Sequence, residues 1–178
     1  MKKTIVAFGA SNSKNSINKQ LAVYTAHQIT DAEVIALDLN DFEMPIYSID
    51  RETESGIPQL AHDFKEALKK ADGIIISFAE HNGAYSVAFK NVFDWVSRIE
   101  KDVWNNKPLL LMATSPGGRG GQTVLEIAFN KMKRMTEGGV FQFSLPSFSQ
   151  NFTPESGIEQ PELKQNFGEV LTQFEQAL

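Results

Sequence analysis

Short apolar runs alternate along the chain with longer amphipathic stretches. Runs such as Ile74–Ile76 and Leu109–Met112 are apolar on successive residues, which is typical of parallel strands covered on both faces. Five runs predict strands at Thr4–Phe8, Glu33–Leu37, Gly73–Phe78, Leu109–Ala113 and Val140–Leu145. Helical patterns predict helices at Ser16–Thr30, Ile57–Lys70, Val87–Lys101, Gly121–Thr136 and Pro161–Leu178.

This alternation of strands and helices predicts an α/β fold with a parallel sheet. Because crossovers between parallel strands are right-handed, the most economical strand order is 2-1-3-4-5, as in a flavodoxin-like three-layer sandwich. No repeat, low-complexity tract or linker composition divides the sequence. Residues 1–178 are therefore expected to form a single domain.

Composition narrows the range of partners. The chain has 178 residues and 42% hydrophobic residues, and its 17 basic and 22 acidic residues give a net charge of -5 without a basic block, so nucleic acid is not an expected partner. Cysteine is absent and the three histidines are scattered, so neither thiol chemistry nor a metal site is expected.

No apolar run reaches the ~18 residues of a membrane helix. The first apolar run ends at Gly9, which favours a cytoplasmic strand over a signal peptide.

A polar loop follows the first predicted strand and leads into a helix. Ser16 is a good N-cap for that helix, whose unsatisfied amides and dipole suit a phosphate dianion. Further donors are predicted from Ser11, Ser13 and Asn18. The Walker and G-x-G-x-x-G patterns are both absent, so this is a phosphate site of another kind. The alternative is a loop that only caps the helix.

A second loop, Glu80-His81-Asn82-Gly83, follows the third predicted strand. Its backbone groups and polar side chains offer the mixture of donors and acceptors that the edge of a pyrimidine-like ring needs, and His81 and Tyr85 could lie against an aromatic plane. The alternative for His81 is a cap or surface residue.

A glycine-rich loop follows the fourth predicted strand. The run from Ser115 to Gly121 has four glycines within five positions, which permit positive φ angles and close approach of the main chain to a ligand. Successive exposed amides form an anion-binding nest. A flexible connector is the alternative. The carboxyl ends of parallel strands share one edge of the sheet, so all three loops are expected to form one site there.

Together, Gly9-Ala10-Ser11 to Ser16-Ile17-Asn18, Glu80-His81-Asn82-Gly83 and Ser115-Pro116-Gly117-Gly118 resemble the NAD(P)H-dependent FMN reductase family over nearly the whole chain. The resemblance implies bound FMN and NADPH or NADH as electron donor. It also implies three sets of FMN contacts. The phosphate set is Ser11, Ser13, Ser16, Ile17 and Asn18. The isoalloxazine set is Glu80, His81, Asn82 and Gly83. The pyrimidine-edge set is Ser115, Pro116, Gly117, Gly118 and Arg119.

The predicted activity is hydride transfer through FMN to a small acceptor such as a quinone, a flavin or an azo compound. No catalytic triad or carboxylate pair stands out, and the cofactor itself carries such chemistry, so no catalytic side chain is predicted. Asp94 and Glu126 fall in predicted helices and are interpreted as surface charges. A one-electron carrier and a flavin-free interaction module remain alternatives. The sequence does not identify the acceptor or the preferred nicotinamide cofactor.

Broad apolar stripes on the third and fourth predicted helices suggest a partner surface. The stripes run from Ala88 to Ile99 and from Val124 to Met135, and each is wider than one core contact needs. Together with the family resemblance they predict a homodimer or a dimer of dimers. Deep burial within one chain is the alternative. The long connection 38–56 is expected to influence which acceptor enters.

Overall fold

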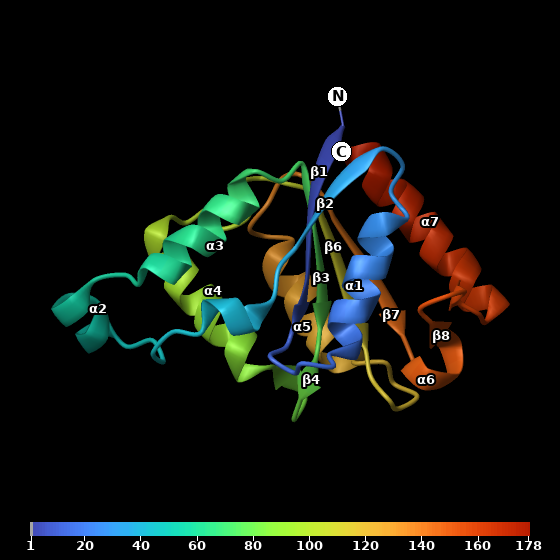
Figure 1. Cartoon of the computed structure of the whole chain (residues 1–178), viewed down its shortest axis with the longest axis horizontal. Coiled ribbons are helices and arrows are strands. Elements are labelled where there is room, and N and C mark those ends of the chain that lie inside the picture. The colour runs from blue at the N-terminus through green and yellow to red at the C-terminus, as the bar shows by residue number, and fades with distance from the viewer. Residues whose placement is uncertain (1) are drawn as a thin grey trace.

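A parallel β-sheet with helices on both faces forms the framework of the protein (Figure 1). The structure is a computed structural model that describes residues 2–178. The strands of the sheet are β1 (Lys3–Ala10), β2 (Ala32–Ala36), β3 (Gly73–Phe78), β6 (Leu109–Thr114) and β7 (Val140–Leu145). The main helices are α1 (Ile17–His27), α3 (Gln59–Lys69), α4 (Val87–Ile99), α5 (Gln122–Met132) and α7 (Pro161–Ala177).

The strand order is β2-β1-β3-β6-β7, and every neighbouring pair is parallel. Numbered within the sheet alone, this is the predicted order 2-1-3-4-5, so the flavodoxin-like prediction is confirmed. The chain reverses its direction of progress across the sheet between β1 and β3. Ligands of open α/β sheets bind at such a switch point, beyond the carboxyl ends of the strands.

Two apolar layers fill the space between the sheet and its helices. Val6 and Phe8 of β1 belong to one layer, which also contains the inner faces of α3, α4 and α5. Ile5 and Ala7 belong to the other, which packs against α1 and α7. Because successive side chains of a strand point to opposite faces, both sides of these strands are buried, as the continuous apolar runs predict.

Several short elements were not predicted. They are η1 (Leu39–Phe42), α2 (Ile49–Ser55), the hairpin of β4 (Glu80–His81) and β5 (Ala84–Tyr85), α6 (Phe148–Asn151), and the hairpin of β8 (Phe152–Thr153) and β9 (Gly157–Ile158). Each is too short to show a clear hydrophobic period.

The expectation that residues 1–178 form a single domain stays a prediction.

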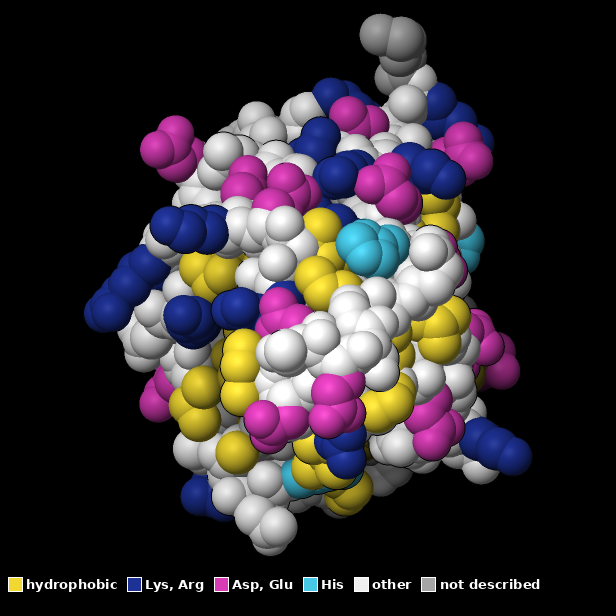
Figure 2. Space-filling model, turned by 90° about the vertical axis from the view of Figure 1, so that its left-hand side faces the viewer, with side chains coloured by type: hydrophobic (Ala, Val, Ile, Leu, Met, Phe, Trp, Pro, Cys, Tyr) yellow, Lys and Arg dark blue, Asp and Glu magenta, His cyan; other side chains and the backbone are white. Residues whose placement is uncertain are grey.

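The three polar loops lie together at one end of the sheet, and the two chain ends lie at the opposite end (Figure 1). The outer face that carries α2, α3 and α4 has interspersed acidic and basic side chains with hydrophobic side chains in small patches between them (Figure 2). Within residues 2–178, no helix combines the length and apolar character needed to cross a bilayer.

Candidate functional site

A cavity of about 210 Å³ opens between the three loops at the carboxyl ends of β1, β3 and β6. Nine of the fourteen predicted site residues line it: Ser11, Ser13, Ser16, Ile17, Asn18, Glu80, His81, Ser115 and Pro116. Asn15, Ala79 and Thr114 complete the lining and were not predicted. Each of these three residues is next in sequence to a predicted site residue, and this position beside a motif is the only feature of the sequence that could have indicated it.

The first loop presents unpaired donors at the start of α1. The amides of Ile17 and Asn18 have no acceptor among residues 2–178. Ser16 Oγ accepts a hydrogen bond from the amide of Lys19 at 3.1 Å, and Ser11 Oγ accepts one from the amide of Ser13 at 3.1 Å. These contacts fix the loop while each hydroxyl keeps its own hydrogen for donation. The arrangement is suited to an anion at a helix N-terminus.

Asn18 has a structural use that the sequence did not indicate. Its side-chain Oδ1 accepts from Ser77 Oγ at 2.7 Å and from the amide of Thr114 at 3.0 Å, while Nδ2 donates to the Thr114 carbonyl at 3.1 Å. The residue is 3% exposed. Its carboxamide therefore links α1 to β3 and β6, and its backbone amide is the group that remains free for a ligand.

The second loop is a tight β-hairpin. Asn82 has φ +52° and Gly83 has φ +75°, and they form the two-residue turn between β4 and β5. Positive φ at both central residues is typical of a type I′ turn, for which Asn-Gly is a preferred sequence. Neither residue lines the cavity between the loops, whereas His81 does. The Asn-Gly pair is therefore a hairpin signal, and the contacts of Asn82 and Gly83 with a ligand stay predictions.

The Glu80 side chain faces the third loop. Its Oε2 accepts a hydrogen bond from the amide of Val124 at 3.1 Å, and its Oε1 lies 3.9 Å from Arg119 Nη2. The Glu80 carboxylate thus contacts the start of α5, and the contact of Glu80 with a ring edge stays a prediction. Glu80 also lines the cavity between the three loops.

The glycines of the third loop divide into two kinds. Gly120 and Gly121 have φ angles of +57° and +72°, and a Cβ on Gly120 would lie 2.5 Å from Ser144 Oγ. Gly118 has open space around it. Gly118 and Arg119 line a separate groove of about 550 Å³ that also contains Ser144. Ser115 and Pro116 are the parts of this loop that line the cavity between the three loops.

A second cavity of about 220 Å³ adjoins the first, and His81 lines both. Its apolar lining is Leu39, Phe42, Met44, Ile46, Val87 and Ala88. Its polar lining is Asn12, Asn40, Glu43, His81 and Asn91. The segment that follows β2 therefore reaches the site, because its residues between Leu39 and Ile46 supply most of the lining of the second cavity.

Asn91 on α4 holds that segment in place. Its Oδ1 accepts from the amide of Tyr47 at 2.9 Å, and its Nδ2 donates to the carbonyls of Met44 and Pro45 at 3.0 and 3.2 Å. Trp95 Nε1, one helical turn further along, also donates to the Pro45 carbonyl at 2.7 Å. The wall of the second cavity is thus fixed by four hydrogen bonds to one helix.

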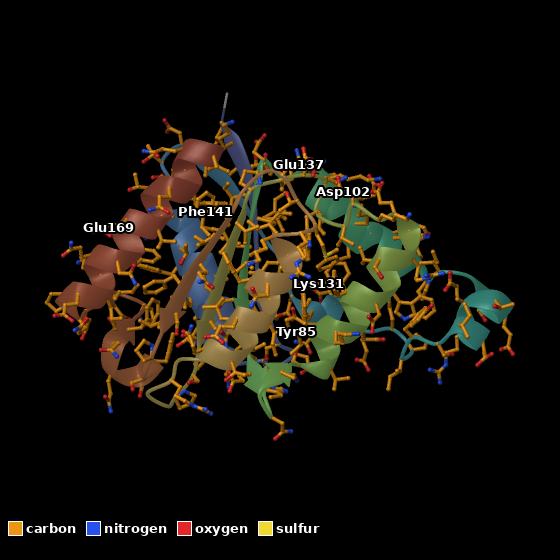
Figure 3. The ribbon with its side chains drawn as sticks, turned by 180° about the vertical axis from the view of Figure 1, so that it is seen from behind. Tyr85, Asp102, Lys131, Glu137, Phe141 and Glu169 are labelled. Carbon is orange, nitrogen blue, oxygen red and sulfur yellow. The ribbon has the colours of Figure 1, made fainter. Side chains whose placement is uncertain are left out.

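Tyr85 lies at the base of the hairpin between α4 and α5 (Figure 3). Its ring contacts Phe78 and Phe89, at centroid distances of 5.5 and 5.1 Å. Burial raises the pKa of its phenol to about 12. The phenol oxygen is buried and has no partner among the described residues. Tyr85 is therefore part of the support under the hairpin and does not line either cavity.

The two helical carboxylates interpreted as surface charges have local partners. Asp94 lies 2.7 Å from Lys90 on the same helix. Glu126 is exposed and accepts from Gln122 Nε2 at 3.1 Å. Neither lines the cavities described above.

A parallel sheet of this order, with its loops gathered around a cavity at the switch point, defines a flavodoxin-like α/β protein. A family profile described as NADPH-dependent FMN reductase matches residues 3–150. The chain belongs to the NADPH-dependent FMN reductase family.

Named relatives agree with this assignment. A quinone reductase of Escherichia coli (strain K12) is 33% identical over 119 residues, which is 66% of this chain and 62% of that protein. An NADPH azoreductase of Bacillus sp. (strain OY1-2) is 30% identical over 121 residues, covering 68% of this chain and 64% of that protein. The matched region thus spans slightly less than two thirds of either relative.

Among solved structures, FerB from Paracoccus denitrificans, a flavoenzyme NAD(P)H:(acceptor) oxidoreductase, superposes with a TM-score of 0.74. The alignment covers 98% of this chain and 96% of FerB at 19% identity. At this identity the likeness shows the fold alone.

Proposed function

We propose that this protein is an FMN-dependent NAD(P)H oxidoreductase that reduces a small acceptor such as a quinone. The observation that carries the proposal is the cavity between the three loops, at whose base the unpaired amides of Ile17 and Asn18 open the N-terminus of α1. A phosphate group is the ligand that such a helix start binds best. Family membership supports FMN as the molecule that bears it.

The residues of the first loop fit the phosphate of FMN. Two helix amides, the hydroxyls of Ser11, Ser13 and Ser16, and the positive end of the α1 dipole would surround a dianion with donors. His81, the backbone of the second loop, Ser115 and Pro116 would flank the ring system from β3 and β6. The chemistry supplied by bound FMN is hydride transfer from NADPH or NADH to the acceptor.

The second cavity would receive the acceptor. It adjoins the first at His81 and combines apolar walls with amide and carboxylate groups. A flat apolar ring with polar edges, such as a quinone, matches this lining, because the walls cover the ring while the polar groups meet its oxygens. The residues Leu39 to Ile46 would exclude acceptors that are too large, since α4 holds them in place.

The test is a visible spectrum of the purified protein with added FMN, followed by anaerobic addition of NADPH or NADH. The expected results are a perturbed flavin band and bleaching within seconds. Substitution Ser16→Ala is expected to weaken FMN binding, because it removes a hydroxyl donor and the α1 cap together. Ser48→Ala serves as the matched control, because the Ser48 hydroxyl caps α2 in the same way and Ser48 lines neither cavity.

The alternatives predict different outcomes of this experiment. A one-electron carrier would bind FMN but accumulate one-electron-reduced flavin during titration and oxidise NADPH slowly. A flavin-free interaction module would leave the FMN spectrum unchanged. Either result would contradict the proposed reductase.

We further infer that the protein is a cytoplasmic homodimer that pairs through α4 and α5. Most of the apolar stripes on these helices is buried within the single chain, so their breadth alone does not require a partner. The support that remains is the exposed side chains Val87 and Ile127, at 69% and 41%, and the partly exposed Phe93 and Phe129. Light scattering at micromolar concentration is expected to give twice the mass of the chain. A monomeric mass would contradict this inference.

A further inference from the structure

Glu80 caps α5 from another part of the chain. The N-cap residue of α5 is Gly121, which has no side chain to accept from the first amides of the helix. The amide of Val124 donates to Glu80 Oε2 at 3.1 Å instead, across 44 residues of sequence. The Glu80 side chain is 15% exposed. A carboxylate is therefore held, largely shielded from water, between the second and third loops.

This contact changes the electrostatic character of the glycine loop. The positive end of a helix dipole is equivalent to roughly half an elementary charge, so a full carboxylate outweighs it. Arg119 offers a compensating charge at 3.9 Å, but its side chain is 84% exposed and screened by solvent. The wall formed by Glu80 and the start of α5 is thus negative, whereas the sequence alone predicts an anion-binding nest.

We propose that Glu80 lowers the reduction potential of the flavin bound in this cavity, by fixing a negative charge at the cavity wall. This inference rests on the proposed function. Two-electron reduction adds negative charge to a flavin, and a fixed charge of the same sign in a partly shielded site disfavours that addition. A lower potential makes the reduced flavin a stronger donor toward its acceptor. Glu80 acts through space and through the position of α5 and takes no part in proton transfer.

Glu80→Gln tests the charge while keeping the shape. A glutamine oxygen can accept from the Val124 amide as the carboxylate does, so the cap persists while the charge is removed. We expect the preference of the protein for reduced over oxidised FMN to rise about tenfold, which is about 30 mV in the midpoint potential of the two-electron couple. The matched control is Glu126→Gln, which removes the same charge from the solvent-facing side of α5 and is expected to leave the potential unchanged.

Arg119→Gln provides an independent test of opposite sign. Removing this exposed cation leaves the negative charge of Glu80 less compensated, so the midpoint potential of bound FMN is expected to fall. The fall should be smaller at high salt, which screens exposed charges. Because Arg119 is almost fully exposed, this variant is expected to fold. If Glu80→Gln does not bind FMN, an unchanged midpoint potential of Arg119→Gln at low salt overturns the inference.

The outcomes separate this inference from the proposed function. If the unmodified protein binds no FMN, the proposed function fails. If it binds FMN and Glu80→Gln has an unchanged or lower potential, the inference is overturned and the reductase assignment stands. Hydrogen exchange of the Val124 amide completes the test. Equal protection in the unmodified protein and Glu80→Gln, together with a raised potential, shows that charge and not a lost cap causes the shift.

Discussion

The Asn18 carboxamide satisfies three polar groups at the buried junction of α1, β3 and β6. Replacing it with alanine leaves the Thr114 amide and carbonyl and the Ser77 hydroxyl without partners. We expect Asn18→Ala to lower the free energy of unfolding by roughly 2–3 kcal/mol, because buried groups without partners cost about 1–3 kcal/mol each and some of them relax. Urea denaturation measures this loss. The exposed neighbour Asn15 is the control, and an equal effect of Asn15→Ala would contradict the assigned role.

The Tyr85 hydroxyl is buried without a partner among the described residues. Removing it in Tyr85→Phe is expected to raise the free energy of unfolding by up to about 1 kcal/mol, since the desolvation cost disappears while the ring contacts remain. Tyr47→Phe is the comparison, because Tyr47 Oη donates to Glu52 Oε2 at 2.9 Å and its loss should not stabilise. Thermal unfolding of both variants measures these changes in stability. A Tyr85→Phe variant that is less stable than the unmodified protein would show that the hydroxyl has a hydrogen-bond partner in solution.

At the scale of single residues, the sequence predicted which residues line the cavity better than it predicted what each side chain contacts. Polar loops after apolar strands identified nine residues that line the cavity. The directions of Asn18 and Glu80 could not be predicted, because each depends on partners far away in the sequence, at Thr114 and Val124. A polar residue in a loop has the same composition whether it faces a ligand or satisfies the fold.

Among the elements, the glycine loop has positions that tolerate a side chain and positions that do not. Gly120 has φ +57°, and a Cβ there would lie 2.5 Å from Ser144 Oγ and 2.8 Å from the Pro146 nitrogen. Gly120→Ala is expected to lower the free energy of unfolding by about 1–3 kcal/mol through backbone strain and this contact. Gly118→Ala meets no heavy atom within 4 Å and is expected to leave stability nearly unchanged. Comparable losses in chemical denaturation would contradict the assignment.

The segment Met44–Tyr47 depends on α4 for its position. Asn91→Leu removes three hydrogen bonds to this segment and is expected to increase amide exchange there and to raise KM for acceptors more than it lowers kcat. Lys90→Ala is the control on the same helix, since the exposed Lys90 pairs only with Asp94 among the described residues. Unchanged exchange in Asn91→Leu would show that Trp95 holds the segment without it.

Long elements were predictable and short ones were not. The strand and helix predictions are confirmed because their apolar patterns extend over whole buried faces. Predicted ends differ by a few residues, as for the first helix, which was predicted to reach Thr30 and ends at His27. The β4–β5 hairpin rests on a two-residue turn, and α2 has no buried residue to give it a period.

For the molecule as a whole, three ion pairs predict how stability responds to acid. Lys19, Arg98 and Lys65 respectively hold the pKa values of Asp38, Glu52 and Glu100 below their ordinary range. A carboxyl group with a lowered pKa stabilises the fold above its unfolded value, near 4, and loses this contribution as the pH falls through the folded value. The unfolding midpoint should therefore be level from pH 7 to about 5 and decline below about 4.5.

Glu100→Gln isolates one of these contributions. Lys65 is buried and also donates to the carbonyls of Asp102 and Val103, so it remains hydrogen-bonded in the variant. The variant is expected to be less stable than the unmodified protein at pH 7 and to approach it as the pH falls. A constant difference between the two from pH 7 to pH 3 would show that the pair does not contribute through its charge.

The two chain ends meet at the edge of the sheet opposite the cavities, where the Lys3 ammonium donates to the Leu178 carbonyl (Figure 1). An attachment made at residue 2 or at residue 178 therefore holds the molecule by the same end of the sheet, the end that lies away from the cavities. A chain immobilised on an electrode through either position would present its open loops to the solution, accessible to dissolved donors and acceptors. Both attachments should give layers of the same orientation.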